Sequence, residues 1–145
     1  MSMHKTSDGL PTPTIRRRLS SMVYDALLLI GVSFFGFMVP NIALGVVFEY
    51  MLPQGFLLLH LIGVVAVYFL WFWSRRRQTL AMRTWKIELR SADGGPAALD
   101  QMLLRFMLAW PSLFLFGIGI FWALIDRDRQ FLHDRLSGTR LVFTG

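Results

Sequence analysis

Between Leu19 and Ser74 the chain carries no lysine or arginine, and most of its residues are apolar. Three consecutive arginines border this region on each side, at residues 16–18 and 75–77. A helix of about 20 apolar residues crosses the hydrocarbon core of a bilayer, and positive residues collect at the cytoplasmic ends of such helices. The pattern therefore predicts two membrane-spanning helices in a hairpin, with both arginine clusters on the cytoplasmic side.

Prolines divide this region into segments. We expect the first span over residues 19–39 and the second over residues 55–73, because Pro40-Asn41 and Pro53-Gln54-Gly55 interrupt the apolar runs. Residues 42–52 are apolar but short. They either extend the first helix beyond a kink or lie in the outer interface.

The hydrophobic period changes after the second span. Residues 84–90 alternate strictly, with Trp85, Ile87 and Leu89 on one face, which is typical of a strand. Residues 139–144 form a second strand candidate directly after Gly138. Together they predict a small cytoplasmic β pair.

A third hydrophobic segment, residues 97–125, lies between the two strand candidates and contains Pro111. One continuous span would place the strands on opposite sides of the membrane, where neither finds a partner for its backbone groups. We therefore prefer two shorter helices broken at Pro111, over residues 96–110 and 112–125. The expected fold is an all-α membrane protein with a Pro-broken third segment, a β pair and both termini cytoplasmic.

Length and composition limit the organisation and the function classes. The chain has 145 residues and is 54% hydrophobic, so we expect a single membrane domain, over residues 15–145. Residues 1–14 are mostly polar, and we expect them to form a disordered cytoplasmic tail. The net charge of +6 gathers at the ends of apolar runs, which argues against nucleic-acid binding. The chain has no cysteine and shows no catalytic motif, so we expect no enzymatic activity, cofactor or metal.

Asp25 is the acidic residue inside the first predicted span. An ionised carboxylate in hydrocarbon costs about 2.5–3.5 kcal/mol, so this residue needs a partner or a use. Arg18 lies two helical turns away, about 10 Å along the axis, too far for a direct bridge within one helix. A cation from another segment, namely Arg105, Arg135 or His133, is the expected partner. Asp25 is then either a proton or cation site or a structural ion pair.

Other polar residues have simpler interpretations. His60, in the second span, is expected to hydrogen-bond across helices, and a proton relay with Glu49 is the alternative. Asp126 begins an acidic and basic stretch that includes His133 and Asp134. Interleaved arginines compete for those carboxylates, so a charged cytoplasmic cap is favoured over a metal site.

Three blocks of sequence resemble the RDD family of membrane proteins, which is named for one arginine and two aspartates. Arg17-Arg18-Leu19-Ser20-Ser21 with Asp25 is similar to the family's first helix, residues 78–83 to its segment after the second span, and residues 132–139 to its tail. Ala81-Met82 departs from the glycine-containing pair that is common there. The resemblance assigns the signature to Arg18, Asp25 and Asp134. We expect support from Arg17, Arg105, Asp126, His133, Arg135 and His60.

The resemblance implies a multi-pass protein of the bacterial inner membrane with a transport-related role, cation–proton exchange included. In that reading the partners are the lipid bilayer, monovalent cations and protons. Asp25 alternates between protonated and cation-bound forms, and the short chain works as a homo-oligomer. The alternative is a non-transporting accessory or scaffold protein whose charged residues serve helix packing and assembly.

Overall fold

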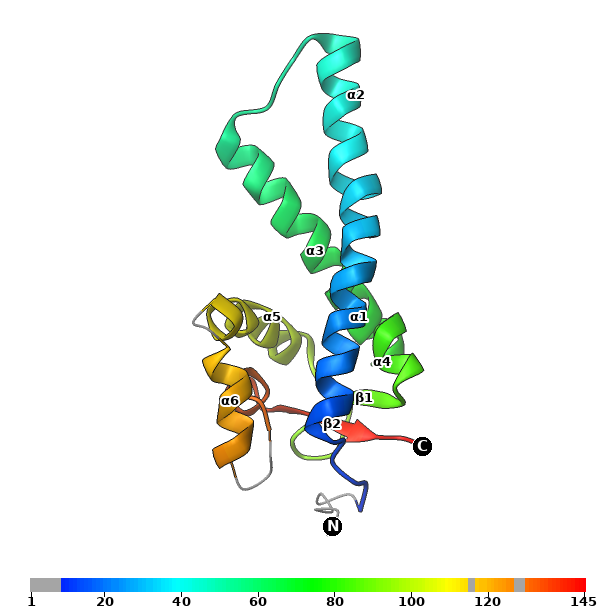
Figure 1. Cartoon of the computed structure of the whole chain (residues 1–145), viewed down its shortest axis with the longest axis vertical. Helices are drawn as coiled ribbons and strands as arrows, with labels where there is room; N and C mark the ends of the chain where they lie inside the picture. The colour runs from blue at the N-terminus through cyan, green and yellow to red at the C-terminus, as the bar shows by residue number, and fades with distance from the viewer. Residues whose placement is uncertain (1–8, 115–116, 127–129) are drawn as a thin grey trace.

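The computed structural model describes residues 9–114, 117–126 and 130–145, and it is mostly helical. Two long helices rise from a compact base that holds the shorter helices and both strands (Figure 1). In chain order the elements are α1 Ile15–Ser33, η1 Phe34–Met38, α2 Val39–Phe48, α3 Gln54–Arg76, α4 Leu80–Thr84, β1 Ile87–Ser91, α5 Leu99–Phe114, α6 Ile118–Ile125, α7 Leu132–Leu136 and β2 Thr139–Phe143.

The first helix does not end at Pro40. It continues through a π-helical segment, η1, into α2, giving 34 helical residues from Ile15 to Phe48. Pro40 has no N–H for the carbonyl one turn earlier, and the wider π turn ends at Met38, two residues before it. The Asn41 side chain donates to the Phe37 carbonyl at 2.6 Å, which satisfies a nearby backbone acceptor. The helix therefore continues past Pro40, where the sequence predicted an interruption, and residues 42–48 extend it.

Both long helices meet the length and composition of membrane spans. Ile15–Phe48 and Gln54–Arg76 have mean hydropathies of 2.1 and 2.2 over their most apolar 18 residues. Their outward side chains are exposed, for example Ile30 at 68% and Val46 at 76%. The hairpin agrees with the sequence-based prediction. The two helices splay apart toward the loop that joins α2 to α3 (Figure 1).

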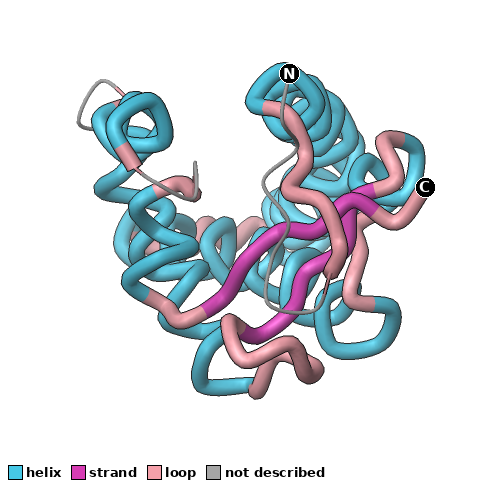
Figure 2. Tube along the Cα trace, turned by 90° about the horizontal axis from the view of Figure 1, so that it is seen from below, coloured by secondary structure: helices cyan, strands magenta, loops and turns pink. Residues whose placement is uncertain are grey.

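The two strands pair antiparallel, as predicted, in a register that places Leu89 opposite Leu141. Viewed from below, they cross the base of the molecule beneath the helices (Figure 2). The first strand begins later than the alternation predicted, at Ile87, because residue 84 still closes the short helix α4. Lys86, with φ of 57°, redirects the chain from that helix into the strand.

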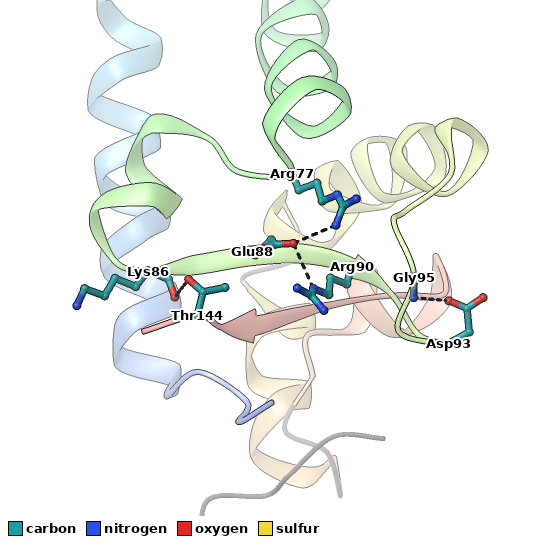
Figure 3. A network of polar contacts seen from close by, with 7 residues as sticks. All are labelled: Arg77, Lys86, Glu88, Arg90, Asp93, Gly95 and Thr144. Carbon is teal, nitrogen blue, oxygen red and sulfur yellow. Dashed lines mark hydrogen bonds and ion pairs between the residues drawn. The ribbon is translucent and has the colours of Figure 1, made fainter. Parts of the chain in front are cut away.

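The strand pair has a buried face and a polar face. Ile87 and Leu89 are fully buried and pack with Trp73, Met102 and Phe106, which fastens the pair to α3 and α5. On the other side Glu88 accepts from two arginines, Arg77 at 3.5 Å and Arg90 at 3.2 Å (Figure 3). The strand pair is thus a platform under the ends of the long helices.

The N-terminal segment joins this platform. Phe143 N donates to the Pro11 carbonyl at 2.9 Å, and Thr14 caps α1 by accepting from Arg17 N at 3.3 Å. Residues 10–14 are therefore held by the fold, although the sequence predicted a disordered tail over 1–14. Residues 1–8 of that tail lie outside the described part of the chain.

The third hydrophobic segment forms a helical hairpin, as preferred from the sequence, but its break is not at Pro111. Pro111 lies inside α5, and the chain turns at Gly117, whose φ of 74° is left-handed. In Figure 1, α5 lies across the direction of α1, and α6 turns back toward the base. This return brings both strands to one end of the molecule, where they can pair.

Gly119 allows the α5–α6 hairpin to close. A Cβ atom at this position would overlap the Ser112 side chain, including its Cβ at 2.7 Å. We expect Gly119→Ala to lower the stability by about 1–3 kcal/mol, the usual cost of overpacking, as measured by thermal unfolding in detergent. Gly45→Ala is the matched control, because Gly45 lies in α2 with nothing within 4 Å. If both variants melt alike, this packing account is wrong.

Candidate functional site

Five ionisable residues converge where α1 meets the base of the molecule. Arg18 and Asp25 come from α1, Arg105 comes from α5, and His133 and Asp134 come from α7. All five are buried, with relative exposures from 0% for Asp134 to 7% for Asp25 and Arg105. Buried charge of this density is stable only when each group finds polar or ionic partners.

The best-buried ion pair in this cluster joins Arg105 Nη1 to Asp134 Oδ1. The Asp134 side chain is 0% exposed and the Arg105 side chain is 8% exposed. The Arg105 guanidinium also lies over the Trp73 ring, 5.0 Å from its centre. Removing one partner of such a buried pair typically costs about 3–5 kcal/mol, so this contact fixes α5 against α7.

Arg18 ties the start of α1 to the segment before α7. Its Nε donates to the Pro13 carbonyl at 3.2 Å, and its guanidinium lies 4.9 Å from the centre of the Phe131 ring. Its neighbour Arg17 points elsewhere. Arg17 contacts the strand platform, donating to the Trp85 carbonyl at 3.4 Å and lying over Phe143.

Asp25 is held by two hydroxyl groups. Tyr68 from α3 donates to Oδ1 and Thr79, just before α4, donates to Oδ2, each at 2.9 Å. The sequence predicted a cation here, from Arg105, Arg135 or His133. Instead, Arg105 pairs with Asp134, and Arg135 pairs with Asp126.

Sequence reasoning missed both hydroxyl donors. Tyrosine is common at the end of a membrane span, so Tyr68 carries no local signal of a contact with a carboxylate. Thr79 does carry a local signal, because a threonine before a short helix is a typical N-cap, and its hydroxyl also accepts from Met82 N at 3.1 Å. Tyr68 lies 43 residues from Asp25 in the sequence and Thr79 lies 54 residues from it. No local sequence pattern encodes contacts over such separations.

A cleft of about 290 Å³ opens beside this cluster, between α1, α3 and α5. Its polar lining comes from Arg18, Ser21, Asp25, Arg105 and His133. The remaining walls are apolar and aromatic: Met22, Ala26, Leu29, Val65, Phe69, Trp73, Met82, Phe106, Ala109, Trp110, Phe131 and Leu141. The structure thus joins a charged floor to an apolar groove.

His133 is electrically neutral in the folded protein. Burial, together with the positive charges of Arg105 and Arg18, lowers its pKa from the usual 6.5 to about 3. Its Nε2 lies 3.6 Å from Asp134 Oδ1. The arginines are therefore the cations of this cleft.

The other predicted site residues lie away from the cleft. Asn41 Nδ2 and His60 Nδ1 are 3.0 Å apart, so His60 makes the expected bond across helices. Glu49 is exposed just beyond the end of α2. Asp126 pairs with Arg135 and accepts from Gln130 N at 3.0 Å, in keeping with a charged cap. Across residues 9–114, 117–126 and 130–145, no group of three or more acidic or histidine side chains is arranged around a metal position.

Comparison with known proteins identifies a family and one relative. The sequence model of the RDD family matches residues 12–138. An uncharacterized protein of Rickettsia prowazekii (strain Madrid E) is 31% identical over 80 residues, which are 54% of this chain and 44% of the relative. The match therefore spans less than half of that relative. No solved structure matches the chain.

The depressed pKa of His133 predicts a pH-dependent stability. Between pH 6.5 and pH 3 the unfolded chain binds a proton at this residue that the folded chain does not, so stability falls as the pH falls through that window. We expect the melting temperature of the protein in detergent to drop from pH 7.5 to pH 5. His133→Asn, which cannot titrate, should show a smaller drop. An equal drop in both proteins would contradict a neutral, buried His133.

Proposed function

Because the chain belongs to the RDD family of membrane proteins, we propose that it is a multi-pass protein of the bacterial inner membrane with a transport-related role. In this proposal Asp25 exchanges a proton for a monovalent cation. The protein acts without an enzymatic step or a bound cofactor. Two helices of membrane-spanning length and composition support the membrane location.

The hydroxyl pair around Asp25 is the observation that carries the proposal. An arginine contact would hold the carboxylate in its ionised form, whereas Tyr68 and Thr79 are neutral. A hydroxyl can donate to an ionised carboxylate and can also accept from a protonated one, after a simple rotation of its O–H. Both protonation states of Asp25 can therefore be satisfied in place, as a residue that loads and releases a proton requires.

The same atoms suit a small hard cation. Oxygen ligands are preferred by such ions, and the carboxylate of Asp25 with the hydroxyls of Tyr68 and Thr79 supplies three oxygen-bearing groups. Ser21 lines the cleft one helical turn before Asp25 and can add a fourth. Charge is conserved when the cation arrives as the proton of Asp25 leaves.

A homo-oligomer is part of the proposal. The two long helices expose apolar side chains over most of their length. Two helices can line only one side of an ion pathway through the membrane. Association of copies by symmetry would complete it.

The alternative function is an accessory or scaffold protein, and the Arg105–Asp134 pair favours it. That pair is wholly internal and fastens two short helices, which is a structural role. In this reading Asp25 would serve only to hold α1 against α3 and Thr79.

Asp25→Asn separates the two functions. The amide oxygen still accepts from one hydroxyl and the amide NH2 donates to the other, but the amide cannot exchange a proton, so fold and assembly should persist. Using purified protein in vesicles with an internal pH-sensitive dye, we expect a sodium or potassium gradient to move protons with the parent chain. With Asp25→Asn we expect the rate to fall to that of protein-free vesicles.

Asp100→Asn is the matched control. Asp100 is an exposed carboxylate in the first turn of α5 and should leave the flux unchanged. If the parent chain moves no protons, or if Asp25→Asn only changes the oligomer size on a sizing column, the accessory function replaces exchange.

The proposed topology can be tested separately, because the chain has no cysteine of its own. Tyr50→Cys lies in the loop between α2 and α3, where Tyr50 is 55% exposed, and Ala92→Cys lies in the exposed turn after β1. In intact cells with a permeabilised outer membrane, an impermeant maleimide should label Tyr50→Cys alone. Labelling of Ala92→Cys before lysis would contradict a cytoplasmic strand pair.

A further inference from the structure

The cleft beside Asp25 has two chemically different parts. Along α1 its lining residues recur on one helix face, from Arg18 through Met22 and Asp25 to Leu29. Those eleven residues of separation correspond to about 16 Å along the axis, at about 1.5 Å per residue. The wall changes over this length from charged to wholly apolar. A bare monovalent ion would not bind to the apolar part, which offers it no oxygen ligands.

The cationic end retains an unused donor. Arg105 gives Nη1 to Asp134, while its Nε is buried and has no hydrogen-bond partner among the residues that the structure describes. The Trp73 ring covers one face of the guanidinium and so holds it without occupying its in-plane donors. A buried donor of this kind normally has an acceptor, and Arg105 is one of the residues that line the cleft.

The charges on the lining favour an anion at this end. Among the described residues of the lining, Arg18 and Arg105 are the two cations and Asp25 is the one carboxylate. Both oxygens of Asp25 already accept from hydroxyls, which reduces their repulsion toward a second anion. Asp134 neutralises part of the charge of Arg105 but, unlike its neighbour His133, does not line the cleft.

We propose that this cleft binds an anionic phospholipid, with its phosphate at Arg18 and Arg105 and one acyl chain between α1, α3 and α5. Guanidinium groups recognise phosphate oxygens through paired, charge-assisted hydrogen bonds. The apolar wall formed by residues such as Leu29, Val65 and Ala109 takes the chain. Basic pockets between membrane helices on the cytoplasmic side are known to hold acidic lipid headgroups.

The position of the cleft agrees with this ligand. Arg18 lies in the first turn of the long helix, beside the arginine run 16–18 that marks the membrane interface in the sequence. A phosphate at Arg18 would therefore lie at headgroup depth, and the chain would extend toward the apolar half of α1. This inference requires only the cleft and does not depend on cation exchange.

Brominated lipids provide a direct test, because bromine quenches tryptophan fluorescence on contact and Trp73 and Trp110 line the cleft. The protein in uncharged detergent micelles is titrated with phosphatidylglycerol carrying a dibromostearoyl chain, with the matched phosphatidylcholine, and with free dibromostearate. We expect phosphatidylglycerol to quench at about tenfold lower mole fraction than phosphatidylcholine, the scale of one charge-assisted hydrogen bond.

Two variants and one control assign the quenching to this cleft. Ala26→Phe fills the apolar groove and should raise the required mole fraction of phosphatidylglycerol about tenfold, while Ala43→Phe, at an exposed alanine of α2 outside the cleft, should not change it. Arg105→Lys keeps the charge opposite Asp134 but loses the Nε donor. It should weaken phosphatidylglycerol and leave phosphatidylcholine unchanged.

The outcomes are distinct from those of the transport test, since no ion gradient is present. Equal quenching by the two phospholipids, or equal behaviour of Ala26→Phe and Ala43→Phe, would overturn the proposal. Tight quenching by dibromostearate without preference for phosphatidylglycerol would also overturn it, and would identify a free fatty acid as the ligand. Binding can be present with no cation flux, and flux can be present with no lipid preference.

Discussion

The buried ion pair between Arg105 and Asp134 is the contact on which the base of the molecule depends. It joins α5 to α7, and β2 follows α7 directly, so the pair also sets where the second strand meets the first. Neither charge can be left alone at such burial without a large cost. The two groups therefore select one packing of the short helices, and that packing forms the floor of the cleft.

Asp25 is also a buried acidic residue, but it is stabilised in a different way from Asp134. Its hydroxyl partners on α3 and before α4 stabilise the carboxylate without neutralising it by a fixed cation. The cluster thus contains one acidic residue committed to an arginine and one that is not. Because of this difference in partners, we propose an exchange role for Asp25 and a structural role for Asp134.

The proposed functions draw on different parts of one cavity. Exchange at Asp25 concerns the oxygen atoms where α1 faces Tyr68, whereas lipid binding concerns the arginines and the apolar groove beside them. The Arg18–Phe131 and Arg105–Trp73 stacking holds both guanidiniums in fixed positions. A ligand at this end would meet a preformed cationic floor, and it would lie in the same cleft as the proposed exchange residue.

The sequence by itself determined the parts of this protein that local patterns encode. Apolar length with arginine borders predicted the two long helices, and a period of two predicted the strand pair, since burial imposes those periods residue by residue. The tertiary structure alone decided that the helix passes Pro40, that the turn falls at Gly117 instead of Pro111, and that Asp25 meets hydroxyls. Such outcomes depend on which distant groups meet, and a single buried carboxylate can be satisfied by any donor that packing brings within reach.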